Sequence, residues 1–160
     1  MADRLAIFDI DGTLTATNAV DDECYLRAVG EALHVDCSGV DWSEMPHVTD
    51  SAIARHLWTR RHGRAPEQRD LDGLQQRFLT ILREELARAP HRFVAIDGAV
   101  DILHQLRSAG WHVALATGAW RESAATKLRA AGVAALPRQV RRSEQGDEFL
   151  FLRSLHGRRA

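Results

Sequence analysis

The stretch LAIFDIDGT at residues 5–13 joins a short apolar run to two acids and a glycine. Residues 5–8 predict a strand, and Asp9 and Asp11 follow where that strand ends. In a continued strand the two carboxylates would share one face. Gly12 lets the chain turn sharply, so the carboxylates can take different positions around one small anion. The stretch therefore predicts a strand that delivers two acids to the edge of a sheet.

Two other structures use similar residues, an ordinary acidic turn and a calcium-binding loop. Asp-Gly pairs are common in the turns of α/β proteins, so the acids alone do not decide the function. An EF-hand loop needs glycine at its sixth position and glutamate at its twelfth, between two helices. Counted from Asp9, the glycine Gly12 is fourth and the twelfth residue is Val20. This spacing excludes the calcium loop.

The composition predicts one globular domain, or one domain with a modest insertion. The chain has 160 residues, of which 45% are hydrophobic, and this is enough for one core. Lys and Arg total 21 while Asp and Glu total 22, so the formal charge of -1 provides no field that would attract nucleic acid or an acidic membrane. Because the sequence has only two cysteines, no leader pattern and no membrane-length apolar run, we expect a cytoplasmic protein.

Helical patterns fill most of the chain between the first strand and residue 97. Apolar residues recur at helical spacing across 19–33 and again, most regularly, across 71–86. Between these stretches, Thr49 is a good N-cap for a helix that Gly63 would end. Roughly 80 residues of helical pattern are far more than a usual connection between strands needs. We therefore expect an inserted helical module.

A second strand-and-helix unit follows this module. Residues 111–116 predict a buried strand that ends at Thr117 and Gly118, and residues 119–131 have a helical pattern. The Thr117 hydroxyl, the close approach that Gly118 allows and the positive end of a helix would together cradle a phosphate group. A threonine before a helix is a common structural cap, so this motif gains its value from the combination with the first one.

Taken in order, the acid-tipped strand, the helical stretch and the strand tipped by Thr-Gly resemble the first two motifs of the haloacid dehalogenase superfamily. Its phosphatase members carry Asp-x-Asp-x-Thr, which Asp9, Asp11 and Thr13 fill here. Its dehalogenases lack an acid at the position of Asp11, so the resemblance disfavours dehalogenation. A helical insertion after the first motif is similar to that of the phosphoglycolate phosphatase-like members. The resemblance covers roughly residues 4–136.

This resemblance implies an α/β fold with a Rossmann-like parallel sheet as its core. Residues 1–16 and 91–160 would form the core, and residues 17–90 would form an inserted helical cap over the active site. Thr49 and Asp50, at the start of the second helix of the cap, would descend onto the substrate.

The resemblance also implies the chemistry of the site. Asp9 would attack a phosphoester as nucleophile and form an aspartyl-phosphate that water then hydrolyses. Asp11 would protonate the leaving alcohol and then activate the water. Mg²⁺ would lie on the Asp9 carboxylate and on the backbone carbonyl of Asp11. Thr117 and the Gly118 amide would hold the transferring oxygens.

Two further motifs of this family, a steadying Lys or Arg and a later strand tipped with acids, have no plain counterpart. Lys127 is about eight residues into the expected helix, roughly 12 Å along its axis, so we expect it to point away from the phosphate. Arg141 and Arg142 lie in a segment with no pattern that selects either. The acids in Gly146-Asp147-Glu148 precede an apolar run instead of following it. We therefore expect a core that is incomplete towards its C-terminus.

The expected function is Mg²⁺-dependent hydrolysis of a small phosphorylated metabolite, and two alternatives stay open. One is a phosphotransferase of the mutase kind, which shares the nucleophile and the acid. The other is a catalytically impaired or truncated protein that binds a phosphate compound or a protein partner. The missing strand would leave one flank of the first strand unpaired, which makes self-association a further expectation. These motifs do not encode the identity of the substrate.

Overall fold

The computed structural model describes residues 4–42, 45, 49–133, 139–141 and 151–153. Along the chain the elements are β1 (Leu5–Phe8), α1 (Asn18–Leu33), α2 (Asp50–His62), α3 (Gln68–Arg88), the 3₁₀ helix η2 (Pro90–Arg92), α4 (Ala99–Ser108), β2 (His112–Leu115), α5 (Arg121–Ala130), β3 (Gln139–Arg141) and β4 (Phe151–Arg153).

The sheet contains one parallel pair and two antiparallel pairs. β1 and β2 are parallel, with Ala6 beside Val113. β4 pairs with β2 and with β3 in antiparallel fashion, which gives the strand order β1-β2-β4-β3. Only residues 142–150 separate β3 from β4, fewer than the dozen or so that a parallel crossover needs, so an antiparallel arrangement follows. The predicted α/β class is confirmed, although the sheet is mixed and not purely parallel.

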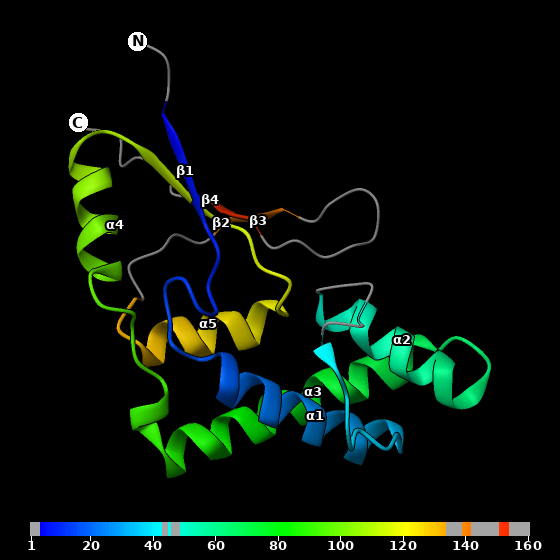
Figure 1. Cartoon of the computed structure of the whole chain (residues 1–160). Helices are drawn as coiled ribbons and strands as arrows, with labels where there is room; N and C mark the ends of the chain where they lie inside the picture. Colours follow the sequence, from blue (N-terminus) through cyan, green and yellow to red (C-terminus); the bar gives the residue numbers. More distant parts are fainter. Residues whose placement is uncertain (1–3, 43–44, 46–48, 134–138, 142–150, 154–160) are drawn as a thin grey trace.

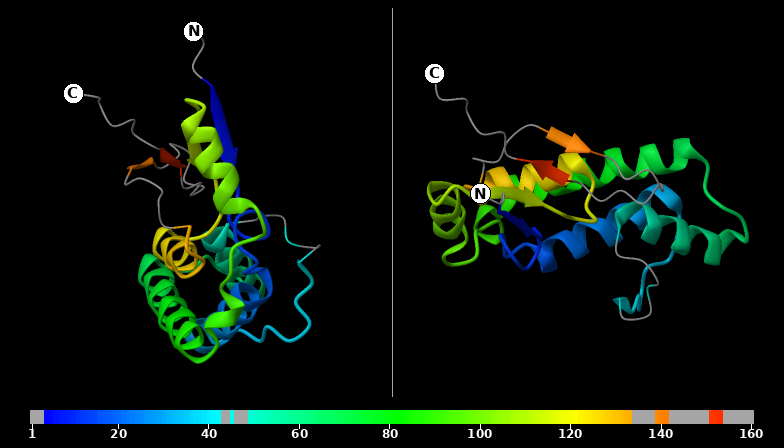
Figure 2. Two further views of the ribbon diagram at one scale, coloured as in Figure 1. Left: turned by 90° about the vertical axis from the view of Figure 1, so that its left-hand side faces the viewer. Right: turned by 90° about the horizontal axis from the view of Figure 1, so that it is seen from above.

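The helices are gathered at one end of this sheet. Figure 1 shows α1, α2 and α3 beyond the ends at which β1 and β2 finish, with α5 between them and the sheet. The same grouping is visible from the two directions of Figure 2, whereas α4 packs against β2. The segments that follow the two parallel strands therefore face the helical group.

Two clusters of buried apolar residues hold this arrangement together. In the first, α1 packs against α3, and the rings of Tyr25 and Phe78 meet edge to face with centroids 5.5 Å apart. Trp120, which precedes α5, is buried in the same cluster. The second cluster joins α4 and α5 to β2 through residues such as Leu103 and Leu128. The division of the chain into core and cap at residues 17 and 90 stays a prediction.

The helix ends agree with the signals in the sequence. The Thr49 hydroxyl accepts a hydrogen bond from the Ala52 amide at the start of α2, and Gly63 ends that helix in the left-handed region at φ 70°. Pro90 begins η2 directly after α3, because a proline cannot continue an α-helix. The predicted cap and stop positions of α2 are confirmed.

A tight turn after β1 sends the chain from the first acid towards α1. The amides of Leu14 and Thr15 both donate to the Ile10 carbonyl, and the Gly12 amide donates to the Thr15 carbonyl. Gly12 has a φ of 77°, and a Cβ atom added to it would lie 2.9 Å from Oδ1 of Asn18. The turn therefore requires glycine both for its backbone conformation and for space.

We expect Gly12→Ala to lower the free energy of unfolding by about 1–2 kcal/mol or more, because alanine is strained at this φ and its methyl group would meet Asn18. Urea denaturation would measure the change. Gly73→Ala is the matched control, since Gly73 is exposed within α3 and an added Cβ would meet nothing within 4 Å. The control should stabilise the protein by about 0.5–1 kcal/mol. Equal effects of the two substitutions would contradict the role given to the turn.

Across the part of the chain that the structure describes, no helix has the length and apolar character that a membrane crossing requires.

Candidate functional site

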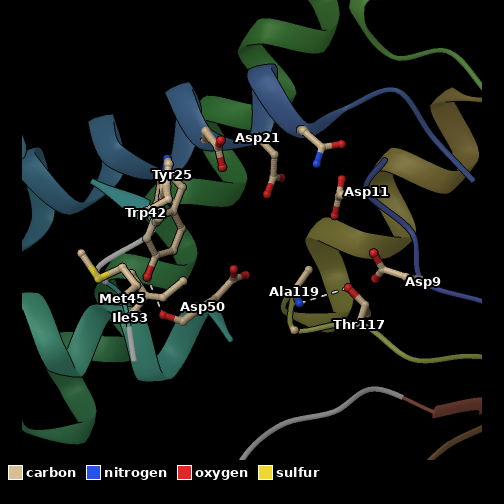
Figure 3. Close-up of a pocket in the computed structure, with 13 residues that line it drawn as sticks. Asp9, Asp11, Asp21, Tyr25, Trp42, Met45, Asp50, Ile53, Thr117 and Ala119 are labelled. Carbon is tan, nitrogen blue, oxygen red and sulfur yellow. Dashed lines mark hydrogen bonds between the residues drawn. The ribbon is translucent and has the colours of Figure 1, made fainter. Parts of the chain in front are cut away.

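A cavity of about 410 Å³ opens where β1 and β2 end. Figure 3 shows Asp9, Asp11 and Thr117 around one end of it, and Tyr25 and Trp42 at the other. The cavity brings together five of the six residues proposed from the sequence, namely Asp9, Asp11, Asp50, Thr117 and Gly118. Its other lining residues are Asn18, Asp21, Asp22, Tyr25, Trp42, Met45, Ile53 and Ala119.

Asp9 follows β1 directly and lies at the exposed rim of the cavity. Partial burial raises its pKa above the ordinary value, although a hydrogen bond with the Ile10 backbone acts in the opposite direction. The charge of Asp11 adds to the increase and the charge of Lys127 opposes it. A carboxylate in this position is accessible to a ligand while retaining only part of its hydration.

Asp11 is held by hydrogen bonds to both carboxylate oxygens. The Thr17 hydroxyl donates to Oδ1 over 2.6 Å, and the Lys127 ammonium donates to Oδ2 over 2.6 Å. Thr17 is itself fixed by a hydroxyl contact of 2.6 Å with Thr15, which bonds to the Ile10 carbonyl. Charge-assisted hydrogen bonds of this length fix the orientation of the carboxylate.

The position of Lys127 contradicts the prediction from the sequence. This lysine was expected to point away from the phosphate, yet its side chain is fully buried and its Nζ binds both Asp11 and Asp21, the latter over 2.7 Å. The prediction counted the distance along α5 from Thr117. It was wrong because the middle of α5 faces the turn after β1 and the first turn of α1, and the long lysine stem reaches both carboxylates.

The charges of neighbouring residues shift the pKa values of Lys127 and Asp21. Burial alone would lower the pKa of Lys127, but the charges of Asp21 and Asp11 outweigh it and raise that pKa above its ordinary value. The lysine is therefore protonated throughout the neutral range. Burial raises the pKa of Asp21, and the attraction of Lys127 offsets only part of the increase. Asp21 was not singled out from the sequence, where it looks like an ordinary acid in the first turn of a helix.

The loop after β2 differs from the expected phosphate cradle in one respect. The Thr117 hydroxyl accepts a hydrogen bond from the Ala119 amide over 3.2 Å, which leaves its proton free to donate to an anion. α5 begins only at Arg121, and not at residue 119. The amide of Trp120 at its start already donates to Oδ2 of Asp50 over 2.8 Å. The groups open to an anion are therefore the Thr117 hydroxyl and the Gly118 amide, without the helix start itself.

Three hydrogen bonds join the start of α2 to this loop. The Asp50 amide donates to the Gly118 carbonyl over 2.9 Å, the Trp120 amide donates to the Asp50 carboxylate, and the Trp120 indole donates to the Ser51 hydroxyl over 2.9 Å. Burial raises the pKa of Asp50 to about 8, and the charge of Asp21 adds to the shift. Thr49 does not line the cavity; its hydroxyl caps α2. Contact of either residue with substrate stays a prediction.

The far end of the cavity was missed by the sequence analysis. Tyr25 is buried, and its hydroxyl donates to the Asp50 carbonyl. Its ring lies 6.5 Å from that of Trp42, centroid to centroid, and Met45 and Ile53 complete this end. These residues come from α1, from α2 and from the chain between those helices, so no local pattern in the sequence could group them.

The types of oxygen ligand at the end of the cavity that contains Asp9 and Asp11 fit Mg²⁺. Mg²⁺ prefers oxygen ligands, uses one or two carboxylates and keeps several waters. The Asp9 carboxylate is accessible, and no backbone hydrogen bond among the described residues uses the Asp11 carbonyl. Each oxygen of the Asp11 carboxylate already accepts one hydrogen bond, from Thr17 or from Lys127, whereas the carbonyl accepts none from the described backbone. No group of three or more His, Cys, Asp or Glu suited to a metal is found within the described ranges.

The remaining sequence candidates lie in or near the C-terminal segment. Arg141 is in β3, while Arg142 and Gly146-Asp147-Glu148 lie outside the described residues. The apolar run that follows those acids contributes Phe151 and Leu152 to β4, which pairs with β2.

The family model of the haloacid dehalogenase-like hydrolases matches residues 4–146 of this chain. The chain belongs to the haloacid dehalogenase-like hydrolases. The resemblance drawn from its first two motifs is thereby confirmed at the level of the family. A comparison with curated proteins gave no significant match.

Two solved structures are similar to this haloacid dehalogenase-like hydrolase. A hydrolase from Pseudomonas syringae is 21% identical, with a TM-score of 0.52, over 81% of this chain and 56% of its own. Its likeness supports the fold. A HAD family hydrolase from Deinococcus radiodurans R1, solved with bound phosphate and sodium, is 22% identical with a TM-score of 0.38, over 82% of this chain and 53% of its own. The chain thus spans just over half the length of either structure.

In this hydrolase we expect Lys127→Met to lower the free energy of unfolding by about 3–5 kcal/mol, because it leaves the carboxylates of Asp11 and Asp21 without their cation. Denaturant unfolding followed by circular dichroism would measure the change. Arg129→Met is the matched control, since Arg129 is an exposed cation on the same helix, and its effect should stay within about 0.5 kcal/mol. Similar unfolding midpoints for the two variants would rule out the structural role of the lysine.

The titration of Asp50 should make the stability of the fold depend on pH. Asp50 has a pKa of about 8 in the folded chain and an ordinary value of 3.8, so the folded state retains a proton that the unfolded state releases between these values. Stability contributed by Asp50 is therefore complete below about pH 4 and is lost as the pH rises through about 8. Asp50→Asn cannot titrate but still offers an oxygen to the Trp120 amide.

The melting temperature of Asp50→Asn should match that of the native chain near pH 4 and exceed it increasingly towards pH 8. Asp101→Asn, at an exposed position on α4, serves as control and should show no such trend. A constant difference between Asp50→Asn and the native chain across this range would show that Asp50 does not titrate there.

Proposed function

We propose that this chain hydrolyses the phosphate monoester of a small metabolite, in a Mg²⁺-dependent reaction that passes through an aspartyl-phosphate on Asp9. The observation that carries the proposal is the single cavity that unites Asp9 and Asp11, after one strand, with Thr117 and Gly118, after the parallel neighbour of that strand. Nucleophile, acid and anion donors are the parts that phosphoryl transfer requires.

In the first step, a carboxylate oxygen of Asp9 attacks the phosphorus atom. The bond between phosphorus and the ester oxygen breaks as the new bond forms, and Asp11 supplies the proton that the leaving alcohol takes up. The Thr117 hydroxyl and the Gly118 amide donate hydrogen bonds to the phosphoryl oxygens, where negative charge is concentrated. Thr17 and Lys127 hold Asp11 in place for the proton transfer.

In the second step, a water molecule attacks the phosphorus atom of the aspartyl-phosphate. Asp11 takes a proton from this water, inorganic phosphate is released, and the Asp9 carboxylate is restored. The contacts from Thr17 and Lys127 fix the orientation of the Asp11 side chain, and the same side chain is used in both steps. Bound Mg²⁺, held by the Asp9 carboxylate and the Asp11 carbonyl, would supply positive charge that offsets the repulsion between phosphate and carboxylates.

A second candidate is a protein that binds a phosphate compound without turning it over. It is favoured by the lack of any group of three metal-ligating side chains in the described segments. Such a protein would use the Thr117 hydroxyl and the Gly118 amide as an anion site and would not depend on Asp9 as a nucleophile.

Asp9→Asn separates the two candidates, because it keeps the shape of the side chain but removes the nucleophile. With Mg²⁺ and a generic aryl phosphate, we expect the variant to release phosphate at least about a thousandfold more slowly than the native chain. Asp101→Asn removes an exposed acid on α4, and we expect it to leave turnover unchanged. Circular dichroism would establish that both variants are folded. Equal turnover by the native chain and Asp9→Asn would refute the proposed hydrolysis.

A further inference from the structure

The cavity is longer than a phosphate group requires, and its two ends differ in chemistry. Figure 3 shows Asp9, Asp11 and Thr117 at the phosphate end, with Asp21 and Asp50 between them and the apolar end. The apolar end, formed by Tyr25, Trp42, Met45 and Ile53, is the space that remains for the leaving group of a phosphate ester.

Acidic side chains are prominent in the lining of this space. The lining residues include five aspartates, Asp9, Asp11, Asp21, Asp22 and Asp50, and none of these described lining residues is Lys, Arg or His. Lys127 lies behind the wall, where Asp11 and Asp21 already engage it. Among the described residues, Asp22 makes no hydrogen bond or ion pair, and the Asp50 carboxylate accepts one hydrogen bond, from the Trp120 amide. The middle of the cavity therefore offers acceptors and no free cation.

The aromatic side chains at the apolar end suit the same kind of ligand. The rings of Tyr25 and Trp42, two residues that line the cavity, are inclined at 51° to each other with centroids 6.5 Å apart. Aromatic faces attract cations, and quaternary ammonium groups above all, through the negative charge of the ring face. Carboxylates next to aromatic walls thus favour a positively charged group over a neutral or negative one.

We propose that the substrate is the phosphate monoester of an amino alcohol, whose ammonium group lies beside the Asp22 carboxylate, next to an oxygen of Asp50 and the rings of Tyr25 and Trp42. This inference rests on the proposed hydrolysis and names the class of its substrate. A phosphate ester with a cationic leaving group brings a counter-charge to the Asp22 carboxylate, which pairs with no described cation. An ester with an acidic leaving group, such as phosphoglycolate, would bring a second anion next to that carboxylate instead.

The test compares three esters that differ in the charge of the leaving group. Phosphocholine carries a quaternary nitrogen, its carbon isostere has the same shape without the charge, and phosphoglycolate is anionic. With Mg²⁺ present, kcat/KM for phosphocholine should exceed that for the isostere roughly tenfold or more, which corresponds to about 1.4 kcal/mol. Phosphoglycolate should be the poorest of the three. Values for phosphocholine and the isostere within about twofold, or a preference for phosphoglycolate, overturn the inference.

Two variants assign the preference to this cavity. Asp22→Asn removes the unpaired carboxylate, so the ratio of kcat/KM between phosphocholine and its isostere should fall towards unity. Asp101→Asn makes the same change of charge at an exposed position on α4 and should keep the ratio of the native chain. A ratio that falls equally in both variants, or in neither, overturns the inference.

The experiment also separates this inference from the proposed function. Turnover of an aryl phosphate that depends on Asp9 but shows no preference for phosphocholine leaves the hydrolysis standing and removes the substrate class. If no ester is turned over, the hydrolysis fails, and calorimetry with choline and its neutral isostere decides the cationic subsite. Tighter binding of choline that is lost in Asp22→Asn supports the subsite, and equal binding of the two alcohols overturns it.

Discussion

The arrangement of the site depends on the ion pairs that the buried ammonium group of Lys127 makes with Asp11 and Asp21. Lys127 lies in the middle of α5, yet it binds one carboxylate from the turn after β1 and another from the first turn of α1. Three segments that are distant in sequence thus meet at one nitrogen atom. Burying an isolated charge in the interior costs free energy, and each of these three charges offsets part of that cost for the others. Removing any one of them would leave a buried charge without its partner.

This ion cluster also explains why the site can hold so many acids. Asp11 and Asp21 are close enough to repel each other, and the two attractions that Lys127 makes with them offset that repulsion. Asp9, Asp22 and Asp50 make no ion pair with a described cation, and burial raises the pKa of each although the charge of Lys127 opposes the increase. The cavity therefore has a part whose acids are paired with a cation and a part whose acids are not, and the second part is the one proposed above for a charged ligand.

Local signals in the sequence were enough for the elements but not for the site as a whole. The strand before Asp9, the cap at Thr49 and the strand before Thr117 were predicted because each depends on neighbouring residues. The partners of Lys127 lie 106 and 116 positions away, and those of Trp120 are 69 and 70 positions away. No periodicity or motif records such contacts, so Asp21, Tyr25 and Trp42 emerged only with the fold. The antiparallel course of β3 and β4 was missed for a related reason, since strand direction is set by pairing partners.

The hydrogen bonds between the start of α2 and the loop after β2 have a mechanical consequence. Asp50 and Ser51 bond to Gly118 and Trp120, so the helix that lines one side of the cavity and the loop that would receive the anion share one set of contacts. A shift of the start of α2 would strain or break those bonds. The position of α2 and the shape of the proposed anion site are therefore coupled, and a ligand that stabilises the loop would also hold the start of α2 in place.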